Sequence, residues 1–204
     1  MNRRRTPGQR AGLSRGVVLG AARELLAERG LEALTMRALA DRLAVSPNTI
    51  YSHVASKTDL IDDVLDDVLA EVDEPDPDVE EPAAGLQALM ASTYHVLLAQ
   101  PDLVPLYLAR QGARGANARR LGDLMLGLLD RVGVSGSRAR EAVRVLVVYT
   151  IGFAAVATRP GSDPGGDPML SAEELLANFE SGLGWLLAGI VSSAAPSAAR
   201  RRGG

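Results

Sequence analysis

The stretch TMRALADRLAVSPNTIYSHVASK, Thr35 to Lys57, contains the start signals of two short helices with a tight turn between them. Thr35 can cap the first helix, which then carries one stripe of apolar residues at helical spacing. Ser46 followed by Pro47 can start the second, because the Ser hydroxyl accepts a free backbone N–H and Pro at the first helical position has none to lose. We therefore predict helices over 36–43 and 47–54.

The second of these helices has a polar surface suited to DNA. Ile50 and Val54 fall on one face and are expected to pack inward. The other positions, most of which can donate or accept a hydrogen bond, are Pro47, Asn48, Thr49, Tyr51, Ser52 and His53. Base edges in the major groove present the complementary groups. This pattern alone is degenerate, however, and an ordinary solvated short helix explains it equally well.

The composition is that of a globular, helical protein. The 204 residues are enough for one or two domains, and two Phe and one Trp beside abundant Ala, Leu and Val favour helices over sheets. With no cysteine, a disulfide framework and thiol chemistry are excluded. No signal peptide is evident, and the longest apolar run, 145–157, is shorter than the roughly 20 residues that span a bilayer. We expect a cytoplasmic protein with no membrane partner.

The net charge of −3 conceals a strong asymmetry. Residues 1–58 hold ten basic and four acidic side chains, a balance of +6, whereas the remainder holds twelve and twenty-one, a balance of −9. A basic end on an acidic body is typical of a protein that contacts a polyanion. Arg3 to Arg5 alone would suggest a solvated tail, but Arg37 and Lys57 flank the second helix of the opening stretch.

The chain divides by its helix signals and by one acidic segment. We predict a disordered basic arm (1–13), a three-helix domain (14–58) whose first helix ends at Gly30, and a connecting helix (59–72) preceded by a Ser56–Asp59 pair at capping-box spacing. DEPDPDVEEP (73–82), with three prolines and six acids, is expected to be a structureless linker and domain boundary. A helical domain (83–192) and a disordered tail (193–204) follow.

The last two helices, about 137–159 and 171–191, are apolar over more than one stripe. The second begins at a capping box formed by Ser171 and Glu174. Since a helix that is apolar nearly all round must be covered on nearly all sides, a second copy of the chain is the economical cover. A buried central helix in a monomer would explain one of the two but not easily both. The glycine-rich segment 161–168 lacks the Lys and Ser or Thr of a phosphate-binding loop.

The sequence offers little that an enzyme would need. There are two histidines, no cysteine and no HExxH or GxSxG motif. We expect no catalytic site, no cofactor and no metal. An architectural, non-specific DNA binder that uses Arg3 to Arg5 and Arg200 to Arg202 remains the other alternative.

The opening stretch, with a capped fourth helix and an all-helical remainder, resembles the TetR (tetracycline-repressor-like) family of bacterial transcriptional regulators. The resemblance rests on Ala21, Ala22, Gly30, Leu34, Thr35, Arg37, Leu39, Ala40, Leu43, Val45, Ser46, Thr49, Tyr51, His53, Lys57 and Leu60. It implies an all-α fold of about nine helices, with an N-terminal helix-turn-helix domain and a C-terminal ligand-binding and dimerisation domain. It also implies a homodimer that binds a palindromic DNA operator, usually as a repressor, and that releases it when a small molecule binds.

The resemblance also implies which residues contact DNA. The implied set is Thr35, Arg37, Ser46, Pro47, Asn48, Thr49, Tyr51, Ser52, His53 and Lys57. Arg37 and 47–49 stand where base edges are contacted, and the chemistry agrees, since Arg can be bidentate to guanine. Tyr51 and Lys57 suit phosphate oxygens. Alternatively, Tyr51 is partly core and His53 only braces the turn.

A ligand pocket is expected among the helices from 83 to 157, lined by Leu, Val and Met. The candidate polar residues are Tyr94, His95, Tyr107, Arg110, Gln111, Tyr149 and Thr150, each of which could instead be an ordinary core or surface residue. His95 is the only histidine outside the first domain. The family's tetracycline sensors hold the drug's magnesium through histidine, so a tetracycline chelate is not expected. We predict a mostly apolar effector.

Overall fold

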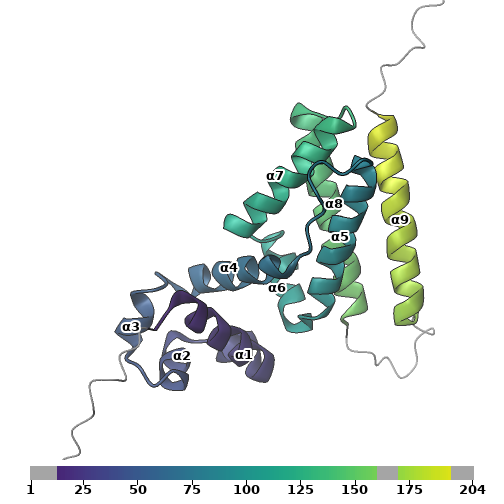
Figure 1. The fold of residues 1–204 in the computed structure, drawn as a ribbon. Helices are drawn as coiled ribbons and strands as arrows, with labels where there is room; N and C mark the ends of the chain where they lie inside the picture. The colour runs from purple at the N-terminus through teal and green to yellow at the C-terminus, as the bar shows by residue number, and fades with distance from the viewer. Residues whose placement is uncertain (1–12, 160–169, 194–204) are drawn as a thin grey trace, which may run out of the picture. The chain divides into compact units, whose positions relative to one another are not determined.

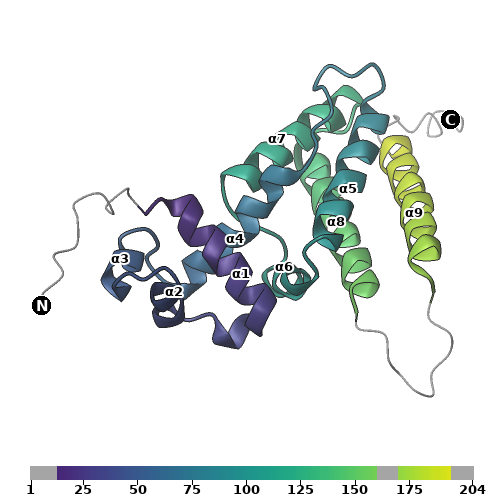
Figure 2. The same cartoon turned by 60° about the horizontal axis from the view of Figure 1, so that its bottom comes forward.

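The structure, a computed structural model, describes residues 13–159 and 170–193. This part of the chain contains nine α-helices, two one-turn 3-10 helices and no β-strand (Figures 1 and 2), which confirms the predicted all-α class. In chain order the elements are α1 (Arg15–Ala33), α2 (Met36–Arg42), α3 (Pro47–Tyr51), α4 (Lys57–Val68), η2 (Leu69–Glu71), α5 (Pro82–Leu98), η3 (Pro101–Leu103), α6 (Val104–Arg110), α7 (Ala116–Arg131), α8 (Gly136–Ala157) and α9 (Ala172–Ser192).

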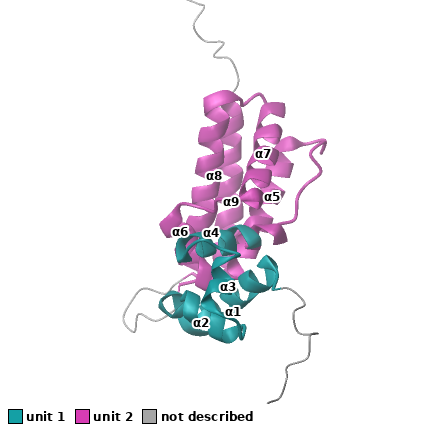
Figure 3. Cartoon of the chain, turned by 90° about the vertical axis from the view of Figure 1, so that its left-hand side faces the viewer, with its two compact units in different colours: residues 1–67 teal, residues 68–204 magenta. Residues whose placement is uncertain are grey.

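The chain divides into two compact units, one up to Asp67 and one from Val68 (Figure 3). The division therefore falls inside α4. In the first unit, α1 begins at Ser14, whose side chain accepts from the Val17 N–H, and it is kinked at Gly30, where φ is +74°. The positive φ favours glycine, which lacks the Cβ that would clash there. The buried residues that hold this unit together include Val18, Ala22, Leu25, Leu34, Leu39, Ile50 and Leu60.

Helix α3 is shorter than the predicted 47–54. It ends at Tyr51 because the next residue closes the turn: the Ser52 hydroxyl donates to the main-chain oxygen of Thr49 at 2.7 Å, and the His53 N–H donates to Ile50 at 2.9 Å. The helix therefore has only five residues. Ile50 and Val54 are both buried, so the predicted inward face is confirmed although the helix does not extend to the second of them.

In the second unit, α5 packs against α7, α8 and α9, and α8 also packs against α6, α7 and α9. Helices α8 and α9 lie side by side in Figures 1 and 2. Aromatic rings fill the space between α5, α8 and α9: the Tyr94 and Phe179 rings stack with centroids 4.2 Å apart, and Tyr149 lies 5.5 Å from Phe179. The predicted capping box is present at the start of α9, where Ser171 and Glu174 exchange backbone–side-chain hydrogen bonds.

The acidic segment 73–82 is not the free linker that we expected. The Asp73 N–H donates to the Ser92 hydroxyl at 2.8 Å, and Glu74 pairs with Arg120 of α7. Arg131, also on α7, donates to two main-chain oxygens of the segment, those of Pro77 and Val79, at 2.6 Å each. Glu74 and the main-chain oxygens of Pro77 and Val79 are thus paired with cations on α7. The segment belongs to the second unit. The division of the chain lies earlier, within the predicted connecting helix 59–72.

Three predicted segments lie wholly or almost wholly outside the described residues: the basic arm 1–13, the glycine-rich segment 161–168 and the tail 193–204. Among the helices that the structure describes, α9 is long and apolar enough by composition to cross a membrane. We had expected no such segment, because the longest apolar run in the sequence, 145–157, is shorter than a bilayer span. A single helix of this kind is weak evidence, since core helices of soluble proteins share its length and composition.

Candidate functional site

The first candidate site is the exposed surface of the helix-turn-helix, made by α2, α3 and the start of α4. Thr35 caps α2 by accepting from the Ala38 N–H at 3.0 Å. Arg37 is exposed, and its guanidinium has no hydrogen bond or ion pair to another described residue. Its five donors are therefore available to an external partner.

Arg42, at the end of α2, differs from Arg37. Its guanidinium forms ion pairs with Glu24 at 2.8 Å and Glu28 at 2.7 Å, both on α1. The hydrogen bonds from Arg42 lower the pKa of Glu28, and those to Glu28 and Glu24 raise the pKa of Arg42. The charge of Arg42 thus braces α2 against α1, whereas the charge of Arg37 does not serve the fold.

The start of α3 is held by two hydroxyls. Ser46 accepts from the Thr49 N–H at 3.3 Å, and the two side-chain oxygens lie 2.9 Å apart. Pro47 and Asn48 are exposed, and neither side chain has a hydrogen bond within the described structure. Of the predicted base-reading positions, Arg37, Pro47 and Asn48 are therefore exposed and make no side-chain bond within the described fold, whereas Thr49 takes part in the cap made by Ser46.

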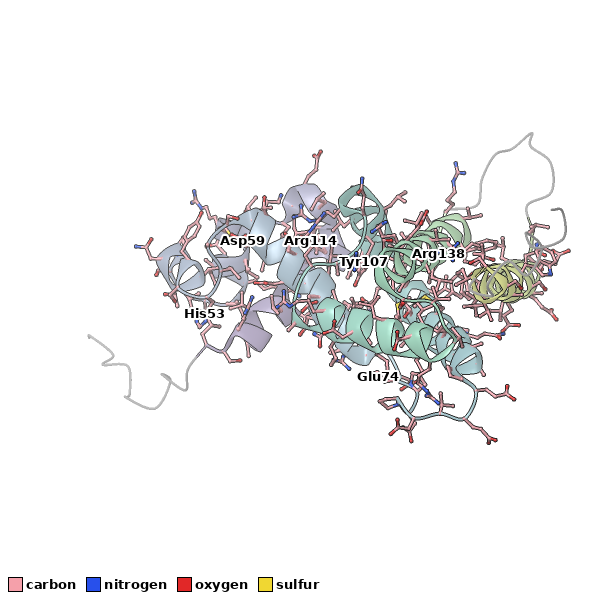
Figure 4. The ribbon with its side chains drawn as sticks, turned by 90° about the horizontal axis from the view of Figure 1, so that it is seen from above. His53, Asp59, Glu74, Tyr107, Arg114 and Arg138 are labelled. Carbon is pink, nitrogen blue, oxygen red and sulfur yellow. The ribbon has the colours of Figure 1, made fainter. Side chains whose placement is uncertain are left out.

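The remaining predicted DNA contacts follow α3 directly. Tyr51 is 51% exposed, which favours a surface position over the partly buried alternative. Ser52 is exposed and closes the helix end, and His53, labelled in Figure 4, is half-buried. Lys57, the first residue of α4, is half-buried, and its ammonium donates to the main-chain oxygen of Leu31 at 3.0 Å. A helix N-terminus with a Lys at its first turn is a favourable place for a phosphate.

The second candidate site is a cavity of about 150 Å³ in the second unit. Its walls come from four α-helices, α5, α6, α7 and α8, from the 3-10 helix η2 and from the turn after α6, so no single sequence motif could reveal it. The lining residues are Leu69, Met90, Thr93, Leu97, Tyr107, Gln111, Gly112, Ala113, Ala118, Leu121, Gly122, Met125, Val143, Val147, Thr150 and Ile151. Most of this surface is apolar, as predicted from the Leu, Val and Met content of these helices.

Three of the seven predicted polar candidates line this cavity: Tyr107 (labelled in Figure 4), Gln111 and Thr150. The buried Thr150 donates to the main-chain oxygen of Leu146 at 2.9 Å. Gln111 is exposed and has a left-handed φ of 57° at the end of α6. The structure also places Thr93 in the wall, which we had not singled out, although it shares one face of α5 with Met90 and Leu97 at helical spacing.

The other four candidates do not line the cavity. Tyr94 is buried in the stack with Phe179, and burial raises the pKa of its phenol. Tyr149 donates to the main-chain oxygen of Phe179 at 2.9 Å, and burial raises its pKa as well. His95 is exposed on α5, and Arg110 is half-buried at the end of α6.

Known proteins are similar to this chain in both units. Residues 18–64 match the family model "Bacterial regulatory proteins, tetR family". An HTH-type transcriptional regulator of Saccharopolyspora erythraea is 33% identical over 69% of this chain and 59% of its own length, so this chain spans about three fifths of that relative. The class A tetracycline repressor of Escherichia coli is 31% identical over 75% of this chain and 71% of its own length.

A solved structure is similar along nearly the whole chain. The Streptomyces coelicolor TetR family protein ActR, in complex with actinorhodin, superposes with a TM-score of 0.76 and 25% sequence identity, covering 92% of this chain and all of that one. The likeness therefore extends well beyond the helix-turn-helix and includes the unit that holds the cavity.

Proposed function

The chain belongs to the TetR family and is a DNA-binding transcriptional regulator, not an enzyme, and from this premise we propose that it represses transcription as a homodimer on a palindromic operator. A small, mostly apolar effector bound in the second unit would release it from DNA. The protein would act in the cytoplasm. Operator binding, the homodimer and the effector are each supported by a different feature of the structure.

The observation that carries operator binding is the set of side chains left free on the helix-turn-helix. Arg37 and Asn48 are exposed and have no side-chain hydrogen bond to described residues, and the apolar ring of Pro47 is exposed next to Asn48, while their neighbours cap and brace the helices. We assign base-edge contacts to these three and to Thr49. The proposed backbone contacts come from Thr35, Ser46, Tyr51, Ser52, His53 and Lys57. Phosphate contacts would position the protein and base contacts would choose the sequence.

The homodimer is supported by apolar side chains on α8 and α9 that the second unit leaves uncovered. Trp185 is 78% exposed, and Val145 and Val148 are 42% and 58% exposed. A groove lined by Val145, Trp185 and Leu186, among others, lies between these two helices. Monomeric soluble proteins rarely leave large contiguous apolar patches in water. A second copy that packs the same helices against this surface would bury it, and a two-fold interface is self-complementary.

We assign the effector to the cavity because the wall of the cavity is mostly apolar. The relative ActR was solved in complex with actinorhodin, an organic ligand, and similarity covers the unit that holds the cavity here. His95 is exposed and absent from the cavity wall, so it is not placed to hold a metal chelate there. We therefore keep Tyr107, Gln111 and Thr150 as ligand contacts and withdraw the role for the other four candidates.

A competition gel shift tests the proposal directly. The probe is an inverted repeat selected by the full-length protein from random duplexes, and the competitor is the same DNA with scrambled half-sites. We expect a preference of at least ~10³ at physiological salt and one complex of fixed size, as a specific dimer gives. A preference of less than tenfold would instead indicate an architectural DNA binder, and binding as a monomer would remove the dimer from the proposal.

A further inference from the structure

We propose that the effector enters the cavity with an uncharged, single-ring portion whose hydroxyl or N–H group donates a hydrogen bond to the hydroxyl oxygen of Thr93 or Thr150. This inference rests on the proposed function, because it assigns a chemical class to the same ligand. Three features of the cavity carry it: the way its two threonines are already bonded, the absence of charge in its wall, and its size.

Both threonine hydroxyls donate to their own helices, and the Thr150 oxygen also lies 3.6 Å from the Met90 sulfur in the wall, a longer and weaker contact. Thr93 donates to the main-chain oxygen of Leu89 at 2.8 Å, and Thr150 donates to that of Leu146 at 2.9 Å, each four residues back along its own helix. A hydroxyl has one proton and two lone pairs. Once the proton is bonded to the helix, a ligand meets a lone pair, so these two groups act as acceptors.

The rest of the wall carries no charge. None of its sixteen residues is Asp, Glu, Lys, Arg or His. The other side chains that can donate are the phenol of Tyr107, which is buried, and the amide of Gln111, which is exposed and also meets water. The sulfurs of Met90 and Met125 are weak acceptors. A carboxylate in this cavity would lose its hydration and gain no cation, which is costly. At the two threonines a carbonyl group would face lone pairs, so it would depend on Tyr107 or Gln111 for a donor.

The volume of the cavity limits the size of the ligand. At about 150 Å³ the cavity is smaller than the ~300–1,000 Å³ that hold drug-sized ligands. It equals an engineered apolar cavity of roughly 150 Å³ that binds benzene. One six-membered ring therefore fits without rearrangement of the wall. A phenolic ring satisfies all three conditions, since it is neutral at pH 7, apolar on its faces and a donor at one edge.

Three ring compounds of similar size separate the alternatives: phenol, which donates; anisole, its methyl ether, which can only accept; and benzoate, which is charged. Titration calorimetry of the full-length protein at pH 7 would measure each. We expect phenol to bind about three- to tenfold more tightly than anisole, the factor that one neutral hydrogen bond gives. Benzoate should show no binding at concentrations where phenol saturates.

Substitutions then locate the acceptor. Thr93→Val with Thr150→Val, close in shape but without hydroxyls, should bring phenol down to the affinity of anisole, whereas the two Thr→Ser changes should keep the difference. Thr158→Val is the matched control. The Thr158 hydroxyl, at the end of α8, donates in the same way to the main-chain oxygen of Ala154, at 2.8 Å, but Thr158 does not line the cavity. It should leave both affinities unchanged. Thermal unfolding of each variant without ligand identifies any that fail to fold, and for those the single substitutions replace the pair.

Four results would overturn the inference: anisole binding as tightly as phenol, benzoate binding at all, no probe binding, or a phenol preference that survives the paired Val substitutions. The operator gel shift separates this failure from that of the proposed function. A protein that selects one palindrome and releases it on binding a carbonyl compound or an anion keeps its role as a ligand-responsive regulator and loses only the effector class proposed here. Loss of selective DNA binding would remove the regulator itself.

Discussion

The ammonium of Lys57 lies 3.0 Å from the main-chain oxygen of Leu31, an oxygen that also accepts the Leu34 N–H at 3.2 Å. The bond joins the first residue of α4 to the chain just after the kink at Gly30. It orders a long side chain that would otherwise lose rotamer entropy on contacting DNA. An ammonium has three donors, so two remain for a phosphate.

Lys57→Ala should therefore weaken binding to all DNA sequences alike. We expect the slope of log affinity against log salt to become shallower by about one, the contribution of one phosphate contact. Binding titrations at four or more salt concentrations would measure it. Arg119→Ala, an exposed cation on α7, is the control and should not alter the slope. An unchanged slope for Lys57→Ala would show that this side chain only supports the fold.

Arg37→Ala should act on sequence preference instead. The unpaired guanidinium of Arg37 can bind one guanine through two hydrogen bonds, and its loss should cost about 1–3 kcal/mol of discrimination at one base pair of each half-site. Affinities for a panel of single-base operator variants would reveal the position. Arg37→Lys keeps the charge but not the planar fork, so it should retain affinity better than selectivity. Equal losses on every operator variant would argue against base contact.

Trp185→Glu should dissociate the proposed homodimer. Trp185 is 78% exposed in one chain and would lie in the proposed interface, where α8 and α9 of two copies meet. Glu at this position would place two charges in that interface, one from each copy. Sedimentation equilibrium should show a monomer, and operator affinity should fall with it. Leu108→Glu on α6, 53% exposed, is the matched control and should leave the dimer intact. A wild-type protein recovered with membranes would contradict this use of α9.

Gly182→Ala should destabilise the second unit. A Cβ at this position of α9 would overlap the hydroxyl of Tyr149, so the Tyr149 bond to Phe179 would have to shift. Overpacking of this kind costs about 1–3 kcal/mol. Gly127→Ala on α7 meets no atom within 4 Å and should instead stabilise by about 0.5–1 kcal/mol through helix propensity. Urea unfolding monitored by circular dichroism would compare the two, and equal midpoints would refute the packing argument.

The Arg42–Glu28 pair makes the first unit sensitive to acid. Because Arg42 lowers the pKa of Glu28 from 4.5, the pair stabilises the folded state above that pH and loses its contribution as the pH falls through the lowered folded-state value. Arg42→Met should therefore be less stable than wild type at pH 7, and the difference should shrink below pH 4.5. Unfolding curves across pH 3–7 test this. A difference that is the same at every pH would assign the effect of Arg42 to packing alone.

Much of the fold could be predicted from local signals. Thr35, Ser46 and Ser171 all cap the helices that the sequence assigned to them, because a cap depends on residues three or four positions away. The end of α3 was missed for an equally local reason. The Ser52 hydroxyl competes for the carbonyl of Thr49, and periodicity alone does not show that competition.

The cavity was harder to predict because its wall depends on distant pairings. Tyr94 was predicted to line the cavity, but it stacks instead on Phe179 of another helix, α9. Tyr149 also lies outside the cavity, because its hydroxyl is bonded to the main chain of the same helix. Thr93 was overlooked because a threonine inside a helix usually bonds its own backbone. That bond is present here, and the proposed role of Thr93 as an acceptor depends on it.

Helix α3, with its five residues, has few positions that serve only one purpose. Ser46 and Thr49 hold the helix together and also lie on the surface proposed to read DNA, so a change there would alter stability and operator preference together. The side chains of Pro47 and Asn48 do not take part in the cap of this helix. In evolutionary terms, paralogues of this regulator could acquire new operators most easily by substitution at 48, whereas 46 and 49 would change only with compensation elsewhere.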